Sequence, residues 1–115
     1  MHKDDFIRLR HMLDAAKDVE QFTQGKTRRD LDEDRLLELG IVKAIEMIGE
    51  AATNVSSELR REFPDIPWED IIGMRNRLIH AYYRIDLNRV WDTVTVDIPP
   101  LRILLEKIVA DYWMD

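Results

Sequence analysis

The sequence predicts an all-α fold, an up-and-down bundle of four or five helices. Apolar residues recur at helical spacing along most of the chain, and neither strand-like alternation nor an Asn-Gly or Asp-Gly hairpin signal appears. Charged residues make up 35% of the 115 residues and apolar residues 45%, as expected for helices that each expose one face to water. A chain of this length is expected to form a single domain, residues 1–115.

The first helix is predicted from an apolar stripe that ends shortly before Gly25, because glycine often follows the last periodic residue of a helix. The stripe consists of Phe6, Leu9, Met12, Leu13, Ala16, Val19 and Phe22. Residues 26–34 are polar and are predicted to form a linker, with Asp30 or Asp32 as the N-cap of the next helix.

The second helix is predicted to be the longest, at residues 32–61, and to be apolar on more than one side. Its main stripe consists of Leu37, Ile41, Ala44, Ile45, Ile48, Ala51, Ala52, Val55 and Leu59. A second, weaker stripe consists of Leu36, Leu39, Val42 and Met47. Gly40 and Gly49 each cost the helix up to about 1 kcal/mol but let another helix approach closely. Two apolar faces indicate a buried central helix or a dimer contact.

Prolines divide the second half of the chain. The third helix is predicted to begin at Pro67 or Trp68, since proline suits a first helical turn, and to end near Ala81 or Tyr82. Asp86 is predicted to cap a fourth helix. Pro99-Pro100 must then kink or break the helix, so the last helix is predicted to be kinked there.

Several classes of protein are not expected. The chain has no cysteine, and its three histidines lie far apart without metal-ligand spacing, so no structural metal is expected. No apolar run is long enough to span a membrane, and the first residues do not form the apolar core of a signal peptide. A cytoplasmic protein without a membrane partner is the expectation.

The charge distribution points to a local phosphate site. The net charge is −6, which argues against general nucleic-acid coating. Residues 74–90 nevertheless hold Arg75, Arg77, Arg84 and Arg89 against one aspartate. A basic island on an acidic chain is typical of a focused phosphate site, although surface arginines can also cluster by chance.

The most informative segment, residues 75–82, combines Arg75, Asn76, His80 and Tyr82. Asn76 and His80 share a helix face, whereas Arg75 and His80 lie roughly 140° apart around the helix axis. They can meet at one phosphate if the helix ends near His80, if a second copy of the chain completes the site across a two-fold axis, or both.

The chemistry available to these groups is proton transfer beside a phosphate. RNA carries its own nucleophile, the 2′-hydroxyl, and an imidazole can take that proton near neutral pH. Arg75 would stabilise the charge that develops on the phosphate oxygens, while Asn76 could orient His80 or bind a phosphate oxygen. Structural roles compete with this interpretation. In purely structural roles, His80 would only interact with a helix dipole and Arg75 would pair with Asp70 or Glu69. The tryptophans are expected in the core.

The pattern Arg-x4-His-x-Tyr, with Asn directly after the Arg, resembles the HEPN superfamily and specifically the HepT-like toxins of toxin–antitoxin pairs. The resemblance covers nearly the whole chain. It is carried also by Gly49-Glu50-Ala51-Ala52, the break from Pro64 to Trp68, Ile71-Ile72-Gly73-Met74-Arg75-Asn76, and the region of Trp91 and Leu101.

The resemblance implies a helical bundle that forms a homodimer, with the two motif helices facing one cleft. It implies a metal-independent endoribonuclease in which Arg75 and His80 are catalytic and Asn76 is a polar helper. From the basic island, Arg77 and Arg84 are the expected RNA-binding residues.

The resemblance also implies a partner, a cognate minimal nucleotidyltransferase antitoxin in a type VII-like system. That partner would use ATP to attach AMP to Tyr82, and the toxin itself would need no cofactor. An anionic adenylate beside Arg75 would occupy the phosphate site and block RNA. The neighbouring Tyr83 is a second possible acceptor.

Two other classes of function share this fold. The chain could be a non-catalytic HEPN partner, an antitoxin or acceptor subunit that regulates the nucleotidyltransferase, or it could be a plain helical dimerisation module. The set of Arg75, Asn76 and His80 favours the ribonuclease, because a pure binding module needs no titratable group at that place.

Overall fold

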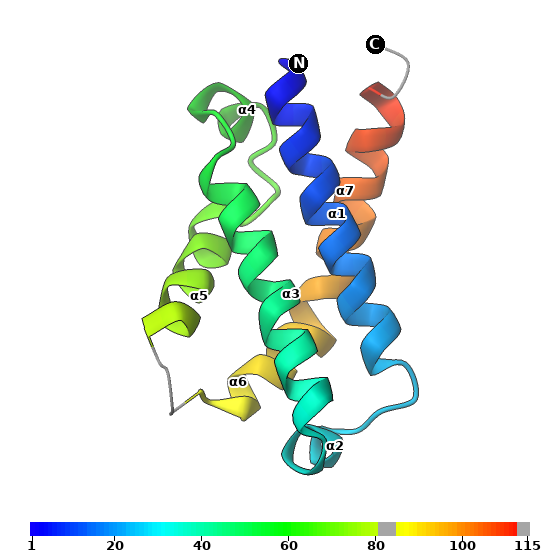
Figure 1. Cartoon of the computed structure of the whole chain (residues 1–115). Coiled ribbons are helices and arrows are strands. Elements are labelled where there is room, and N and C mark those ends of the chain that lie inside the picture. Colours follow the sequence, from blue (N-terminus) through cyan, green and yellow to red (C-terminus); the bar gives the residue numbers. More distant parts are fainter. Residues whose placement is uncertain (81–84, 113–115) are drawn as a thin grey trace.

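The computed structural model describes residues 1–80 and 85–112, and these residues form seven α-helices and one π-helical segment. The elements, shown in Figure 1, are α1 (Lys3–Thr23), α2 (Arg28–Glu33), α3 (Arg35–Thr53), α4 (Ser57–Glu62), α5 (Trp68–His80), α6 (Leu87–Asp92), the π-helix η1 (Thr93–Asp97) and α7 (Ile98–Tyr112). No strand occurs in these two described ranges, which confirms the predicted all-α class.

The long helices alternate in direction, as an up-and-down bundle requires (Figure 1). α1 runs down, α3 up, α5 down, and the continuous series α6, η1 and α7 runs up again. The short helix α2 lies at one end of the bundle, whereas α4 lies at the other end, beside the start of α1 and the end of α7. No helix within the described ranges is both long and apolar enough to cross a membrane.

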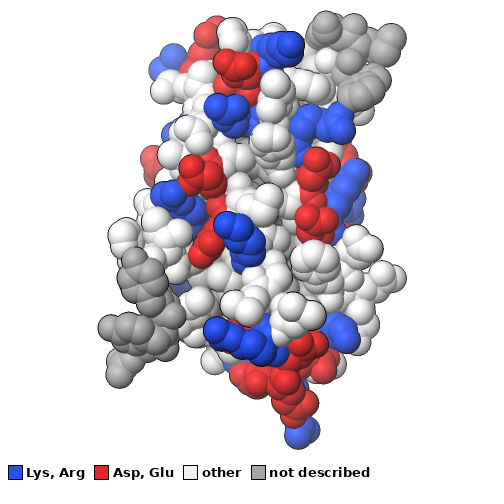
Figure 2. Space-filling model, in the orientation of Figure 1, with Lys and Arg blue, Asp and Glu red and all other residues white. Residues whose placement is uncertain are grey.

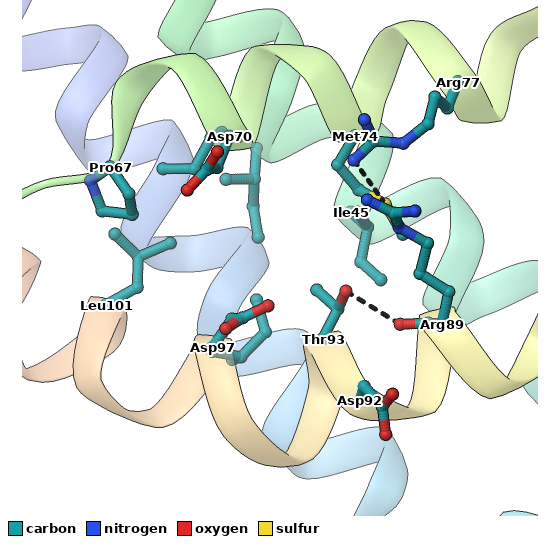
Figure 3. Close-up of a pocket in the computed structure, with 13 residues that line it drawn as sticks. Ile45, Pro67, Asp70, Met74, Arg77, Arg89, Asp92, Thr93, Asp97 and Leu101 are labelled. Atoms are coloured by element: carbon teal, nitrogen blue, oxygen red, sulfur yellow. Dashed lines mark hydrogen bonds between the residues drawn. The ribbon is translucent and has the colours of Figure 1, made fainter.

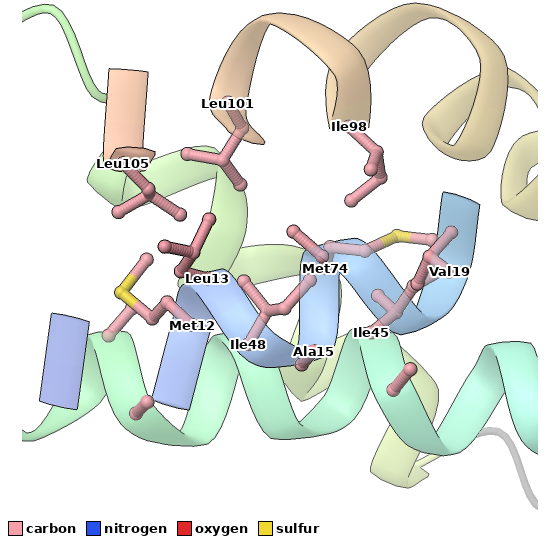
Figure 4. Packing of buried hydrophobic residues seen from close by; sticks show 14 of the residues in the cluster. Met12, Leu13, Ala15, Val19, Ile45, Ile48, Met74, Ile98, Leu101 and Leu105 are labelled. Atoms are coloured by element: carbon pink, nitrogen blue, oxygen red, sulfur yellow. The ribbon is translucent and has the colours of Figure 1, made fainter. Parts of the chain in front are cut away.

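The core lies between α1, α3 and α7 and continues under α5 (Figure 4). α3 packs against both α1 and α5, and α1 also packs against α7. Leu9, Met12, Ile41 and Leu105 are among the most fully buried side chains. The main stripe predicted for α3 forms the inner face of this arrangement, so that α3 is the central helix of the bundle.

The prediction of one helix over residues 32–61 is wrong, because the chain there forms three helices with breaks at Asp34 and at residues 54–56. Asp34 ends α2 and caps α3, since its carboxylate accepts the Leu37 N–H at 3.1 Å. Neither Asp30 nor Asp32 is the N-cap. Asp30 lies inside α2 and accepts the Thr27 N–H at 2.7 Å.

The second break is fixed by a buried carboxylate. Asp5 accepts hydrogen bonds from the Ser56 N–H at 2.9 Å and from the Ser56 hydroxyl at 2.7 Å. Ser56 in turn caps α4 by accepting the Leu59 N–H at 3.2 Å. The hydrogen bonds from Ser56 to Asp5 join residues that are far apart in the sequence. The helical periodicity of this segment could therefore not reveal the break.

The other predicted boundaries agree with the structure where it describes them. α1 ends at Thr23, and Gly25 follows with a φ of 73°. α5 begins at Trp68, whose indole N–H donates to the Phe63 carbonyl at 3.0 Å. Its predicted last residues, Ala81 or Tyr82, lie outside the described residues, and His80 is the last described residue of the helix.

Asp86 caps α6 as predicted, because its carboxylate accepts the N–H groups of Asn88 and Arg89. The predicted irregularity near Pro99-Pro100 falls in the π-helical residues Thr93–Asp97 just before them. Both prolines lack the N–H that continues an α-helical ladder. The ladder widens ahead of them, with the Ile98 N–H donating to the Thr93 carbonyl five residues earlier.

Candidate functional site

Arg75 is positioned by a close approach of α5 to α3 at Gly49. A Cβ atom added to Gly49 would lie 2.1 Å from the Arg75 Cβ and 3.2 Å from the Ile71 carbonyl oxygen. No side chain fits between the two helices at this point. Because Gly49 has no side chain, the Cβ of Arg75 can pack directly against the backbone of α3.

Two polar contacts then hold the Arg75 guanidinium. It forms an ion pair with Glu50, the residue after Gly49 on α3, and its Nη1 donates to the Asn76 side-chain oxygen at 3.1 Å. The expected alternative pairing of Arg75 with Asp70 or Glu69 is not the one that forms. Arg75 keeps 26% of its side-chain surface exposed, so the guanidinium remains accessible to an anion.

Arg75 lines a shallow groove of about 530 Å³ formed by α1, α3 and α5. Arg8, His11 and Lys43 also line this groove, together with Glu46 and Glu50. Over the face formed by α1 and α3, acidic and basic side chains alternate rather than forming a field of one sign (Figure 2). Arg75 is thus one cation of a mixed groove.

His80 lies elsewhere on the same helix. It is exposed, is the last described residue of α5, and lines a hollow of about 430 Å³ with Arg77, Ile85, Asp86 and Arg89. No hydrogen bond joins the described His80 to Arg75 or Asn76. Within one chain a hydrogen bond joins Arg75 to Asn76, whereas Arg75 and His80 line different hollows, as the angle between these two residues on a helix requires.

The predicted RNA-binding residues divide in the same way. Arg77 lies beside His80 and also lines a larger cleft on the far side of α5 from the Arg75 groove. Tyr82, Tyr83 and Arg84 lie outside the described residues.

The larger cleft, of about 570 Å³, separates α5 from α6, η1 and the start of α7 (Figure 3). Arg77 and Arg89 lie toward one end of it, while Asp70 and Asp97 lie toward the other. Its inner wall is apolar and is formed by Ile45, Ile48, Ile71, Met74, Ile98 and Leu101.

Sequence reasoning missed this cleft and its acidic end. Asp70 was considered only as an alternative partner of Arg75, and Asp97 had no assigned role. Partial burial raises the pKa of Asp97, and the negative charges of Asp70 and Asp92 raise this pKa further. The signal in the sequence was the presence of Arg89, Asp92 and Asp97 in an otherwise uncharged segment, and their common cleft becomes apparent only when the path of the π-helical turn is known.

No group of three or more His, Asp or Glu side chains among residues 1–80 and 85–112 is arranged to hold a metal ion. Glu50 lines the Arg75 groove and His80 lines the hollow near the last described turn of α5. Asp70, Asp92 and Asp97 line the larger cleft.

The fold and these residues define a small helical-bundle protein that presents an Arg-Asn-x3-His segment on α5. A sequence model of the family described as Ribonuclease HepT-like matches residues 12–108. The chain belongs to this family, which confirms the resemblance to HepT-like members of the HEPN superfamily.

Individual relatives agree with this assignment. The chain is 36% identical over 107 residues to a protein named "Probable ribonuclease HepT" from Thermococcus cleftensis, covering 93% of this chain and 94% of that one. It is 32% identical over 101 residues to a "Putative RNase" from Caldanaerobacter subterraneus, covering 88% of this chain and 90% of that one.

A third relative is longer. The chain is 36% identical over 111 residues to a protein named "Gamma-glutamylcyclotransferase and putative RNase" from Methanocaldococcus jannaschii. The match covers 96% of this chain and spans only half the length of that relative. No solved structure matches the chain significantly.

Proposed function

We propose that this protein is a metal-independent endoribonuclease toxin of a type VII-like toxin–antitoxin pair that acts in the cytoplasm. The observation that carries the proposal is the position of Arg75. Its Cβ packs against Gly49, its side chain stays partly exposed, and it lies on the same helix as His80, the exposed last described residue of α5. Membership in a ribonuclease family supports the assignment of RNA as the substrate.

In this mechanism the His80 imidazole takes the proton of an RNA 2′-hydroxyl. The 2′-oxygen then attacks the adjacent phosphorus to form a 2′,3′-cyclic phosphate, the bond to the 5′-oxygen breaks, and that leaving oxygen takes up a proton from water. Arg75 stabilises the negative charge that develops on the phosphate oxygens, and Asn76 holds the guanidinium in place by the hydrogen bond described above. To bind the phosphate, Arg75 exchanges its ion pair with Glu50 for the substrate.

Since Arg75 and His80 line different hollows of one chain, the proposal includes a homodimer in which one protomer's Arg75 meets the partner's His80. An apolar row on the outer face of α3 supports this arrangement. Leu36 is 80% exposed, Leu39 49% and Met47 47%, and Met47 also lines the Arg75 groove. Exposed apolar side chains on one helix face are typical of an interaction surface.

The first experiment measures growth after induced expression, together with cleavage of cellular RNA by the purified protein in the presence of EDTA. We expect the wild type to arrest growth, and Arg75→Ala and His80→Ala each to reduce cleavage by at least about 100-fold, as loss of an acid–base group or an oxyanion donor does. Arg61→Ala, which removes another exposed arginine at the end of α4, is the matched control and should keep full activity.

Two outcomes would contradict the proposal. Harmless expression of a folded wild type without any partner would favour the non-catalytic role as an antitoxin or acceptor subunit. Loss of cleavage in EDTA, restored by a divalent cation, would overturn the metal-independent mechanism.

The proposal assigns neutralisation to a cognate minimal nucleotidyltransferase, which transfers AMP from ATP to Tyr82. Mass spectrometry after co-expression with such an enzyme should show added AMP on the peptide that contains Tyr82, and Tyr82→Phe should remove this modification. An adduct that persists in Tyr82→Phe and disappears in Tyr83→Phe would move the acceptor to Tyr83.

A further inference from the structure

We propose that the cleft between α5 and the series α6, η1 and α7 is a nucleotide subsite that binds one guanosine nucleotide of the RNA. This inference deepens the proposed function and rests on it for the identity of the natural ligand. The subsite has three parts, which would bind the phosphate, the face of the base and the edge of the base.

The phosphate part is formed by two arginines from different elements. Arg77 of α5 and Arg89 of α6 extend toward the same end of the cleft (Figure 3). Among the described residues, neither guanidinium forms an ion pair with a carboxylate, and the Arg77 guanidinium donates weakly to the Met74 sulfur at 3.8 Å. A guanidinium without an ion pair can offer several N–H donors to a phosphate, and its planar geometry is well suited to this ligand.

The second part is the apolar inner wall, which offers a surface for the face of a base. Met74 lies in this wall next to the arginine end of the cleft, and its polarisable thioether suits contact with an aromatic ring. The cleft volume of about 570 Å³ is within the range of small-molecule sites. A nucleotide could therefore place its base on this wall while its phosphate reaches the arginines.

The third part is the acidic end, where Asp70 of α5 and Asp97 of η1 lie on opposite walls (Figure 3). An ionised carboxylate only accepts hydrogen bonds. Guanine is the base whose Watson–Crick edge presents two adjacent donors, N1–H and the N2 amino group, whereas adenine and cytosine present one amino donor beside a ring acceptor. A carboxylate at this place therefore favours guanine. Burial first and the nearby carboxylates second raise the pKa of Asp97, and hydrogen bonds from the guanine N–H groups would stabilise its ionised form.

The π-helical turn aligns the second wall of the cleft. Arg89, Thr93 and Asp97 succeed one another at four-residue steps and all line the cleft. Thr93 and Asp97 are the first and last residues of the π-helical turn, and both line the cleft. The π-helical segment that precedes the prolines therefore supplies polar side chains to this wall of the cleft.

The test is binding of 5′-GMP to the full-length protein, measured by isothermal titration calorimetry beside AMP, CMP, UMP and inosine monophosphate. We expect GMP to bind at least about tenfold more tightly than the other four, as follows from a bidentate bond to a charged acceptor. Inosine monophosphate is the sharpest comparison, because it keeps N1–H and lacks only the N2 amino group.

Two variants separate the parts of the subsite. Arg89→Ala should weaken GMP at least about tenfold while leaving the binding of guanosine, which has no phosphate, unchanged. Asp97→Asn should reduce the affinity for GMP to that for AMP. The matched controls are Arg61→Ala on α4 and Asp18→Asn on the outer face of α1, which should both bind GMP as the wild type does.

Equal affinity of the wild type for all five nucleotides, or unchanged GMP binding in both Arg89→Ala and Asp97→Asn, would overturn the subsite. Its failure is distinguishable from failure of the proposed function. RNA cleavage without any GMP preference would remove the subsite and leave the ribonuclease, whereas GMP binding by a protein that cleaves no RNA would do the reverse. Arg75→Ala should bind GMP normally, since it lines a different groove.

Discussion

At the scale of single residues, the charged side chains of this protein owe their roles to the neighbours that other helices supply. Arg75 has a carboxylate partner, Glu50, on α3, whereas Arg77, two residues later, has none among the described residues. Helical geometry alone predicts that these two arginines point to different sides. It does not predict which side holds an acidic partner, because that depends on how α3 packs.

The first prediction concerns the pH dependence of Asp97. Because its pKa in the folded state lies above the ordinary value of 3.8, the folded protein holds this proton more tightly than the unfolded chain does. The contribution of Asp97 to stability therefore falls as pH rises from about 3.8 through the folded pKa. Asp97→Asn should raise the urea midpoint at pH 7 and lose this advantage as pH falls toward 4.

The control for this measurement is Asp18→Asn, an exposed aspartate on α1, which should follow the wild type at both pH values. A lower midpoint for Asp97→Asn than for the wild type at pH 7 would show that the carboxylate makes a favourable contact instead.

At the scale of helices, the sequence predicted the all-helical class, but it predicted neither the π-helical segment η1 nor the interruptions of the long second helix. The apolar periodicity continues through residues 32–61, and for that reason it could not show the breaks at Asp34 and Ser56. Both breaks depend on a side chain that competes for backbone N–H groups. For Ser56 the decisive partner is Asp5, fifty-one residues earlier.

The second prediction uses the two glycines of α3 as a pair. Gly49→Ala should lower the free energy of unfolding by about 1–3 kcal/mol, because the new Cβ would overlap the Arg75 Cβ. Gly40→Ala adds the same methyl group where the nearest atoms, in the Phe22 ring, are at an ordinary contact distance of 3.5 Å. It should be neutral or stabilise the helix by up to about 1 kcal/mol. Urea unfolding of both variants measures the difference.

Cleavage assays extend the same comparison to the site. If Gly49→Ala displaces Arg75, it should also lose ribonuclease activity, whereas Gly40→Ala should keep it. Equal stability and equal activity of the two variants would show that α3 and α5 can separate without consequence.

At the scale of the whole molecule, the candidate site is distributed over three hollows on two sides of α5. The sequence supplied Arg75, Asn76, His80 and Arg77 as candidates. It could not supply the cleft, whose walls come from parts of the chain that are distant in sequence. The proposed homodimer is what would bring the parts of the catalytic site together.

The third prediction tests that homodimer by sedimentation. Leu39→Glu combined with Met47→Glu places two charges on the outer face of α3 and should convert a dimeric wild type to monomers that no longer cleave RNA. Ile103→Glu is the matched control, since Ile103 is 57% exposed but lies on α7. A wild type that is monomeric at the concentrations where it cleaves RNA would contradict the dimeric site.

The positions of the chain ends have a practical consequence. Lys3 and Tyr112 both lie at the end of the bundle that carries α4, whereas α5 runs away from that end toward His80 (Figure 1). An affinity tag or a reporter protein joined at either terminus would therefore stand well clear of His80. Fusions of this kind offer a convenient way to immobilise the protein for binding assays. A relative about twice as long contains a segment similar to this chain.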